Sequence, residues 1–253
     1  MHPFIDGISS YSLFVTLGTI TGGVVMAALV FWESRKFIKS VFVSALFLLM
    51  ILAGLYAAAL LRKLTYWEFR TFSEFLSKLW QYEGRHFLGA VLFAVIVYPF
   101  VFKLIMRGKR VLTPDGFPQI QNASAFCIGI EQIFNRIACF LNGCCYGRPY
   151  TGIGSLKFPG ITHRVYPTQL IEIFGIAAVL AVCYARWLKK KDGNIFSFFC
   201  VGFAAVIFVS EIFIDQVGTL RVMGMSFIQL AAILLAVLGV IQHQTKKMKQ
   251  NNK

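Results

Sequence analysis

Residues 122–147 read NASAFCIGIEQIFNRIACFLNGCCYG. The stretch begins as an apolar run of about 20 residues, the length that crosses a bilayer, and ends in a turn rich in glycine and cysteine. Arg136 stands inside the apolar run. A guanidinium in the membrane costs roughly 2.5–3.5 kcal/mol on insertion scales, so it is retained where its charge has a partner or a task. The stretch therefore predicts a membrane-spanning helix that carries a functional arginine.

The composition of the whole chain supports a membrane protein. Of 253 residues, 57% are hydrophobic and only 14% are charged, whereas soluble domains carry roughly 25% charged residues. The net charge of +14 would also suit a nucleic-acid-binding protein. However, the basic residues lie in short loops that flank apolar runs, where membrane topology places them. We therefore predict an integral membrane protein with no nucleic acid partner.

Seven apolar runs predict the fold class, an all-α polytopic membrane protein with about seven transmembrane helices in a single domain over residues 1–253. The runs cover residues 12–32, 40–61, 87–106, 122–142, 167–187, 196–215 and 224–242. Loops dense in Lys and Arg follow the first, third, fifth and seventh runs, so these loops are predicted to be cytoplasmic. The N-terminus then lies outside, and the basic tail 243–253 is cytoplasmic.

The segment 62–86 is predicted to be an interfacial arm on the outer face. It is not apolar enough to span, but large apolar residues recur at three- and four-residue steps among charged ones, a pattern typical of an amphipathic helix in the membrane interface. These residues are Leu64, Trp67, Phe72, Phe75, Leu76, Leu79 and Trp80. Such a helix either forms a lateral gate for lipid or simply packs against the bundle.

Arg136 is predicted to lie in the outer half of the membrane. It is 14 residues into a span that begins at Asn122 on the inner side, a rise of about 21 Å. Gln132 and Cys139 share its helix face by four- and three-residue spacing. Glu131 precedes Arg136 by five residues and lies on another face, so an ion pair within the helix is not expected.

Other polar groups also gather near the outer ends of the spans. They are Tyr11, Arg85, His86, Asn135, Asn142, His163, Arg164, Thr168, Gln169, Glu172, Ser210, Glu211, Asp215, Ser226 and Gln229. Any one of them is explained by hydrogen bonding between helices. As a set, they predict a functional cavity that opens to the outer leaflet.

The ionisable residues in this set suggest phosphate chemistry. Arginine is planar and permanently charged, which suits phosphate oxygens. Three arginines near one leaflet favour a phospholipid headgroup or a lipid-linked phosphate: Arg85, Arg136 and Arg164. Three carboxylates either orient these arginines, act as a general base, or serve as simple counter-ions: Glu172, Glu211 and Asp215.

The six cysteines fall into two groups. Three are isolated in apolar spans and are predicted to be small core residues: Cys127, Cys183 and Cys200. The other three cluster near the outer face, where a disulfide that includes Cys139 is one alternative. A nucleophilic cysteine would need a base, for which His163 is the candidate. A metal site would want more ligands at recognisable spacing, so no metal site is predicted.

The segment Asn135–Gly147 resembles the characteristic segment of the bacterial prolipoprotein diacylglyceryl transferases, which reads roughly G-R-x-G-N-F-x-N-G-E-x-x-G. The matching residues are Arg136, Phe140, Asn142, Gly143 and Gly147. The stretch Tyr166–Glu172 is similar to the family's P-x-Q-L-Y-E at the head of a span. Weaker matches are Ser10–Leu13, Glu211 and Met225–Leu230. The Gly-Cys-Cys-Tyr-Gly variant is similar to a divergent branch of that family.

The chain departs from the family pattern at several positions. The His-Gly-Gly before the third span is absent, and His86 is displaced from the family histidine by about two positions. Cys139 stands at an asparagine position and Cys144 at a glutamate position. The remaining replacements are Asn122 at an aspartate position and Ile207 at an arginine position.

The resemblance implies that a diacylglyceryl group passes from phosphatidylglycerol to the lipobox cysteine thiol of a prolipoprotein signal peptide, in the bacterial plasma membrane and without a cofactor. Arg136 would hold the departing phosphate, and His86, Glu172 or Glu211 would take the thiol proton. Residues expected to contact substrate are Tyr11, Arg85, Cys139, Asn142, Gly147, Arg164, Gln169, Ser226 and Gln229. The alternatives are a lipid transferase with another acceptor, a non-enzymatic lipid or anion binder, and a membrane thiol–disulfide protein.

Overall fold

The computed structural model describes residues 4–5, 8–35, 37–66, 87–106, 117–189, 194–214 and 221–251. The helices within these ranges are α1 Ser10–Ser34, α2 Phe37–Tyr66, α4 Phe87–Met106, α5 Phe117–Asn142, α6 Thr168–Leu188, α7 Ile195–Ile212 and α8 Phe227–Asn251. Two short antiparallel hairpins pair β1 Phe4–Ile5 with β2 Ile8–Ser9 and β3 Arg221–Val222 with β4 Met225–Ser226. The prediction of an all-α fold is confirmed.

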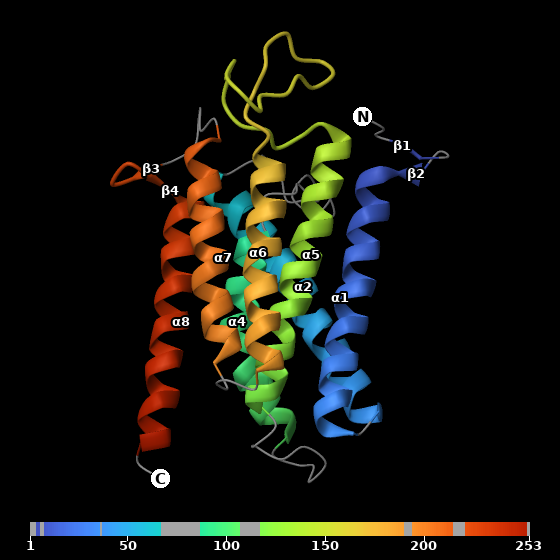
Figure 1. Cartoon of the computed structure of the whole chain (residues 1–253), viewed down its shortest axis with the longest axis vertical. Coiled ribbons are helices and arrows are strands. Elements are labelled where there is room, and N and C mark those ends of the chain that lie inside the picture. The colour runs from blue at the N-terminus through green and yellow to red at the C-terminus, as the bar shows by residue number, and fades with distance from the viewer. Residues whose placement is uncertain are drawn as a thin grey trace. The chain divides into compact units, whose positions relative to one another are not determined.

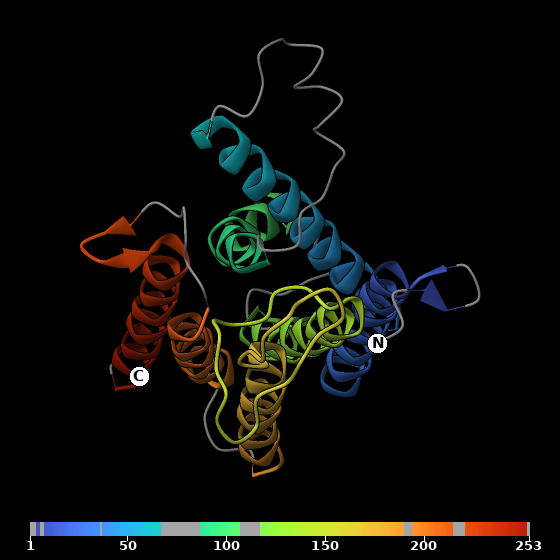
Figure 2. The same ribbon diagram turned by 90° about the horizontal axis from the view of Figure 1, so that it is seen from above.

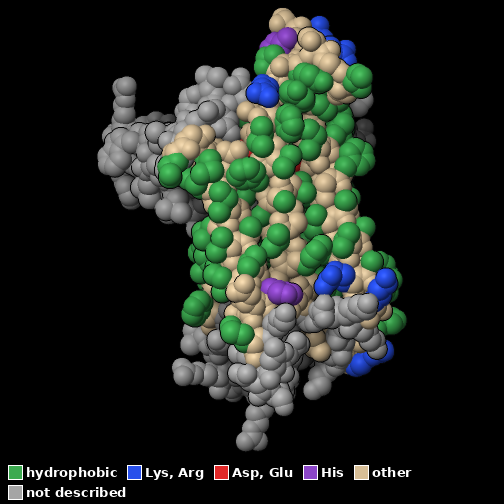
Figure 3. All heavy atoms as spheres, turned by 60° about the vertical axis from the view of Figure 1, so that its left-hand side comes forward, with side chains coloured by type: hydrophobic (Ala, Val, Ile, Leu, Met, Phe, Trp, Pro, Cys, Tyr) green, Lys and Arg blue, Asp and Glu red, His purple; other side chains and the backbone are tan. Residues whose placement is uncertain are grey.

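The protein is a multi-pass membrane protein. Among the described residues, α1, α5, α6, α7 and α8 are long and apolar enough to cross a bilayer, and α2 contains a shorter apolar stretch, Ser40–Gly54. Large apolar side chains on α8 are exposed, including Val237 and Ile241. Figure 3 shows such side chains covering the middle of this face, while Lys and Arg gather near its ends. The number of seven spans stays a prediction.

The chain divides into two compact units, Met1–Arg35 with Asp115–Lys253 and Lys36–Pro114. In the second unit, α2 packs against α4. In the first unit, α5, α6 and α7 contact one another, α1 packs on α5, and α8 packs on α7 (Figures 1 and 2). The prediction of a single domain remains untested.

Helix α5 is the buried centre of its unit. Of its apolar window, 61% is buried inside the protein, against 22% for α8. This explains why α5 is the least apolar of the predicted spans, since polar side chains in membrane helices face the bundle interior. Gly18 and Gly22 of α1 allow close contact with α5, because a Cβ on Gly18 would lie 2.6 Å from the Cβ of Phe134. Small residues at this spacing are a common way for membrane helices to pack.

Several predicted boundaries shift. Helix α7 ends at Ile212 rather than 215. Beyond this end, the Phe213 N–H donates to the Ser210 carbonyl over 3.1 Å, and the Phe213 carbonyl accepts from the Arg148 N–H over 2.8 Å. Helix α8 begins at Phe227 rather than 224, after a hairpin that turns at Gly224 with a φ of 80°. It also continues to Asn251, through most of the predicted tail.

Two further predictions meet the limits of the described residues. Residues 62–66 of the predicted interfacial arm form the end of α2, and residues 67–86 lie outside the described residues. The candidates Arg85, His86 and Asp215 lie outside them as well.

Candidate functional site

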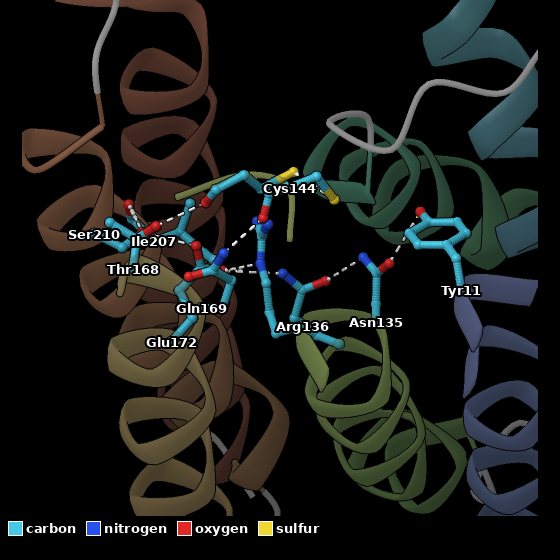
Figure 4. A network of polar contacts seen from close by, with 11 residues as sticks. Tyr11, Asn135, Arg136, Cys144, Thr168, Gln169, Glu172, Ile207 and Ser210 are labelled. Carbon is cyan, nitrogen blue, oxygen red and sulfur yellow. Dashed lines mark hydrogen bonds and ion pairs between the residues drawn. The ribbon is translucent and has the colours of Figure 1, made fainter. Parts of the chain in front are cut away.

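A buried ion pair joins α5 to α6. The Nε atom of Arg136 donates to Oε2 of Glu172 over 2.6 Å, and the side chains are 13% and 2% exposed. Arg136 lies in the last two turns of α5, and Glu172 lies in the second turn of α6. The two residues are brought together because α5 and α6 are neighbouring antiparallel helices that meet at this end of the unit (Figure 4).

Glu172 also accepts hydrogen bonds from two other side chains. Gln132 of α5 donates from Nε2 to Oε2 over 3.1 Å, and Ser210 of α7 lies with its Oγ 3.1 Å from Oε1. The Ser210 hydroxyl also lies 3.0 Å from the carbonyl of Ile207. Both carboxylate oxygens are therefore engaged, and the charge of Glu172 is balanced where α5, α6 and α7 converge.

The network continues to α1 through amide side chains. Asn135 donates from Nδ2 to Oε1 of Gln132 over 3.3 Å, and the hydroxyl of Tyr11 donates to Oδ1 of Asn135 over 3.3 Å. Four helices thus contribute to one polar cluster within the membrane (Figure 4). The sequence placed Gln132 on the face of Arg136, and Asn135 and Ser210 among the polar groups of the predicted cavity, but it predicted no catalytic or substrate-binding role for these three residues.

The segment 143–167, called the head segment here, covers the same end of the unit (Figure 1). The first turn of α6 holds its beginning, because Gln169 Nε2 donates to the Cys144 carbonyl over 2.6 Å and Thr168 Oγ1 donates to the Cys145 carbonyl over 2.8 Å. Gly147 is packed so closely that a Cβ there would lie 2.5 Å from the Phe213 carbonyl oxygen. There is no room for a side chain at position 147, so the structure requires the glycine that also matches the family motif.

Three residues that are predicted to contact substrate make hydrogen bonds within the protein. Arg164 is exposed on the head segment, where its Nε donates to Ser155 Oγ over 2.8 Å. Ser226 and Gln229 form a capping box at the start of α8: Ser226 N–H donates to Gln229 Oε1 over 3.0 Å, and Gln229 N–H donates to Ser226 Oγ over 3.2 Å. This reciprocal arrangement satisfies two N–H groups that a helix start leaves free. Substrate binding by these residues stays a prediction.

The remaining candidates differ in exposure. Cys139 and Gln169 are fully buried, and Glu211 is 4% exposed. Tyr11 is half-buried, and Asn142 is exposed at the end of α5. Glu211 follows Ser210, which is the residue of α7 that lies against Glu172.

Glu131 lies apart from this network, as its helix face predicted. Its Oε1 accepts from Thr19 Oγ1 of α1 over 3.1 Å, and its Oε2 is buried with no hydrogen-bond partner among the residues that the structure describes. Polar contacts also occur toward the other end of the unit. Gln242 donates to Gln121 over 2.6 Å, and Asn122 accepts from the Phe196 N–H over 3.1 Å. Polar groups are therefore less confined to one end than the sequence suggested.

Three cysteines lie together beside the network. The Sγ atoms of Cys139, Cys144 and Cys145 all lie within 4.8 Å of one another, and all six cysteines are free thiols in the structure. A hydrogen bond with Cys139 lowers the pKa of the Cys144 thiol, but the Cys145 thiol and burial raise it more, so the pKa lies above its ordinary value of 9.0. A raised pKa disfavours the thiolate form, and with it a role for Cys144 as a nucleophile.

The sequence profile of the prolipoprotein diacylglyceryl transferases matches residues 4–243. The chain belongs to this family. The match includes every helix of the polar network, and the resemblance drawn from residues 135–147 and 166–172 is confirmed at the level of the family.

Similar proteins carry the name phosphatidylglycerol–prolipoprotein diacylglyceryl transferase. One from Campylobacter curvus is 30% identical over 130 residues, which cover 49% of this chain and 47% of the relative. One from Azospirillum brasilense is 32% identical over 148 residues, or 54% of each chain. A third, from Dehalococcoides mccartyi, is 23% identical over 96% of this chain and 92% of the relative. In the first alignments, the chain spans about half the length of its relatives.

The site can hold an anion at a fixed position. Nε of Arg136 is committed to Glu172, and no hydrogen-bond partner is found for its two terminal nitrogens within the described part of the chain. A guanidinium fixed at one edge presents the other nitrogens in a plane that matches two phosphate oxygens.

Proposed function

We propose that this protein transfers a diacylglyceryl group from phosphatidylglycerol to the lipobox cysteine thiol of prolipoproteins. Family membership supports the reaction class, and the names of the relatives support the two substrates. The observation that carries the proposal is the geometry of Arg136, whose Nε is fixed by Glu172 while its terminal nitrogens remain available among the described residues.

In the proposed reaction, the acceptor supplies the nucleophile. Its thiolate attacks the carbon of the diacylglycerol unit that is bonded to the phosphate oxygen. A C–S bond forms, the C–O bond of that carbon breaks, and glycerol phosphate leaves with the electron pair. Charge develops on the departing phosphate, and Arg136 is positioned to stabilise it in a buried site where such stabilisation is strong. This proposal requires neither a metal nor an organic cofactor.

Glu172 is better suited to position Arg136 than to accept the thiol proton. Its Oε2 accepts from Arg136 and Gln132, and its Oε1 lies against the Ser210 hydroxyl. Taking a proton would therefore require an existing hydrogen bond to break. Glu211, on the same helix as Ser210, and His86 remain the candidate bases for the acceptor thiol.

We further propose that the polar network faces the outer leaflet of the bacterial plasma membrane. In this orientation, the N-terminus lies outside and the C-terminus is cytoplasmic. The beginning of the described chain and the end of α8 lie at opposite ends of their unit (Figure 1), which fits such a topology. Phosphatidylglycerol and the signal peptides of prolipoproteins then reach the site from the same leaflet.

The direct test uses purified protein in vesicles that contain phosphatidylglycerol and a synthetic lipobox peptide. Mass spectrometry should detect a diacylglyceryl thioether on the peptide cysteine. Arg136→Ala should abolish the product while the protein remains folded. Lys157→Ala is the matched control, because it removes an exposed cation from the head segment and should leave the rate unchanged.

One observation favours a second candidate, a lipid-binding protein without transferase activity. Ile207 stands at a position where the resemblance implies an arginine, and it is a buried apolar residue whose carbonyl faces Ser210. Tight binding of phosphatidylglycerol that depends on Arg136, with no thioether formed from any lipobox peptide, would support this candidate and reject the transferase.

A further inference from the structure

Cys139 and Cys144 are brought together by the way α5 ends. The Gly143 N–H donates to the Phe140 carbonyl over 3.2 Å, and the Cys144 N–H donates to the Cys139 carbonyl over 3.0 Å. Gly143 has a φ of 71°. These features define a Schellman motif, in which the residue after the left-handed glycine folds back over the last turn of the helix. This fold-back brings the thiol of Cys144 close to the thiol of Cys139.

Cys145 adds the third sulfur through an unusual backbone conformation. Its φ is 59°, in the left-handed region that non-glycine residues rarely adopt. Neighbouring side chains of an extended backbone point to opposite sides, but here the Sγ atoms of Cys144 and Cys145 lie 3.8 Å apart. The three sulfur atoms, all within 4.8 Å of one another, thus form one compact group.

The backbone that carries two of these cysteines is fixed by α6. Gln169 holds the Cys144 carbonyl over 2.6 Å, and Thr168 holds the Cys145 carbonyl over 2.8 Å (Figure 4). Cys139 is part of α5 and is fully buried. The sulfur atoms are therefore arranged by two rigid helices, which is the condition for a preorganised ligand set.

We infer that Cys139, Cys144 and Cys145 form a three-sulfur binding site for a thiophilic cation of the Cu(I) class. Soft thiolate ligands select such cations. A metal–sulfur bond of about 2.3 Å in trigonal geometry places two sulfurs about 4.0 Å apart, near the 3.8 Å that separates the Sγ atoms of Cys144 and Cys145. A disulfide would instead require two sulfurs to approach to about 2.05 Å.

Ligand number and charge also fit this cation. Among the described residues, the group contains three possible ligand atoms, and Cu(I) accepts trigonal coordination, whereas structural zinc sites have four ligands. Each coordinating thiol releases its proton to the solvent, so the occupied site carries negative charge. Arg136 precedes Cys139 by one helical turn, so its guanidinium, although paired with Glu172, lies beside the thiolates and favours their charged form. The inference does not depend on the proposed transferase reaction.

The first experiment measures the affinity for Cu(I). Reduced wild-type protein in detergent, titrated anaerobically with Cu(I) against a coloured Cu(I) chelator, should bind one Cu(I) per chain. Serine at any one position of the group should weaken binding at least tenfold. The matched control replaces the isolated cysteines, Cys127, Cys183 and Cys200, and should retain the wild-type affinity. No binding by the wild type, or equal losses in the control, would overturn the site.

A second measurement needs no variant and so does not depend on the folding of one. Cu(I) should slow the maleimide alkylation of Cys144 and Cys145 in the wild-type protein at least tenfold, as followed by peptide mass spectrometry. Both thiols are half-buried and within reach of the reagent. Alkylation at an unchanged rate overturns the site. After exposure to air, a disulfide between Cys139 and Cys144 with oxygen as the oxidant, while Cu(I) stays with the chelator, also overturns it in favour of a redox pair.

Discussion

Oε2 of Glu172 lies 2.6 Å from Nε of Arg136, and the two residues are 36 positions apart in the sequence. This contact turns an isolated charge within a membrane helix into an oriented one. The edge of the guanidinium with the two terminal nitrogens then remains available to a ligand. The contact therefore has both a stabilising and a functional consequence, and these are separable by mutation.

Glu172→Gln should lower the stability of the protein. The change leaves Arg136 as a buried charge without its counter-ion, which costs about 3–5 kcal/mol in buried pairs. Thermal unfolding in detergent should show a clear decrease in the melting temperature. Glu131→Gln is the control, because Glu131 is also buried but its side-chain hydrogen bond, among the described residues, is with the neutral Thr19. Its expected cost is about 1 kcal/mol; an equal loss in both variants would contradict the importance of the pair.

Arg136→Lys should keep the fold but lose roughly 10²–10³ of the transfer rate, the loss typical when one donor to developing charge is removed. Lysine has a single ammonium and cannot hold Glu172 while also presenting two planar nitrogens to phosphate. The measurement is the rate of thioether formation at saturating phosphatidylglycerol. A lysine variant with the wild-type rate would show that a point charge is sufficient.

Gly147→Ala should disturb the contact between the head segment and α7. The new Cβ would lie 2.5 Å from the Phe213 carbonyl oxygen and 2.8 Å from the Tyr166 Cβ, and such overpacking typically costs 1–3 kcal/mol, occasionally more. Limited proteolysis should cut the head segment faster, and the transfer rate should decrease. Thr151→Ala is the control, since Thr151 is an exposed residue of the same segment. If both variants behave alike, the close packing at Gly147 is not what matters.

Ser226→Ala should act on helix stability rather than on the affinity for lipid. It removes the capping box at the start of α8, for an expected loss of about 1 kcal/mol. The KM for phosphatidylglycerol should stay unchanged. Gln229→Glu preserves the capping-box pattern and should be closer to the wild type in stability. An increase in KM without a loss of stability would restore the predicted role of Ser226 in substrate binding.

Local features of the sequence were sufficient to predict the positions of α4 and α6. The run 87–106 coincides with α4, and the run 167–187 differs from α6 by one residue at each end. These elements follow from apolar length and from Pro167 before a helix start, which are properties of neighbouring residues. The end of α7 could not be placed in this way, because the apolar run continues with Phe213 and Ile214 after the helix has ended at Ile212.

The tertiary structure was needed to identify which residues of the site contact each other. The sequence named Arg136, Glu172 and Glu211 but could not select the partner of Arg136, since that choice depends on how α6 is rotated against α5. It also predicted that Ser226 and Gln229 contact substrate, which stays a prediction, and only the structure shows that the two residues cap α8. The signal for the capping box, a serine followed three residues later by glutamine, was present in the sequence.

By itself, the sequence determined a membrane protein of helices, with an arginine in a buried span and the motifs of its family, because hydropathy and motif spacing are written along the chain. Only the tertiary structure decided that Glu172 holds Arg136 and that Cys139, Cys144 and Cys145 share one place. The physical reason is that these contacts arise from the rotation of packed helices and from left-handed turns at Gly143 and Cys145, which no local pattern of residues specifies.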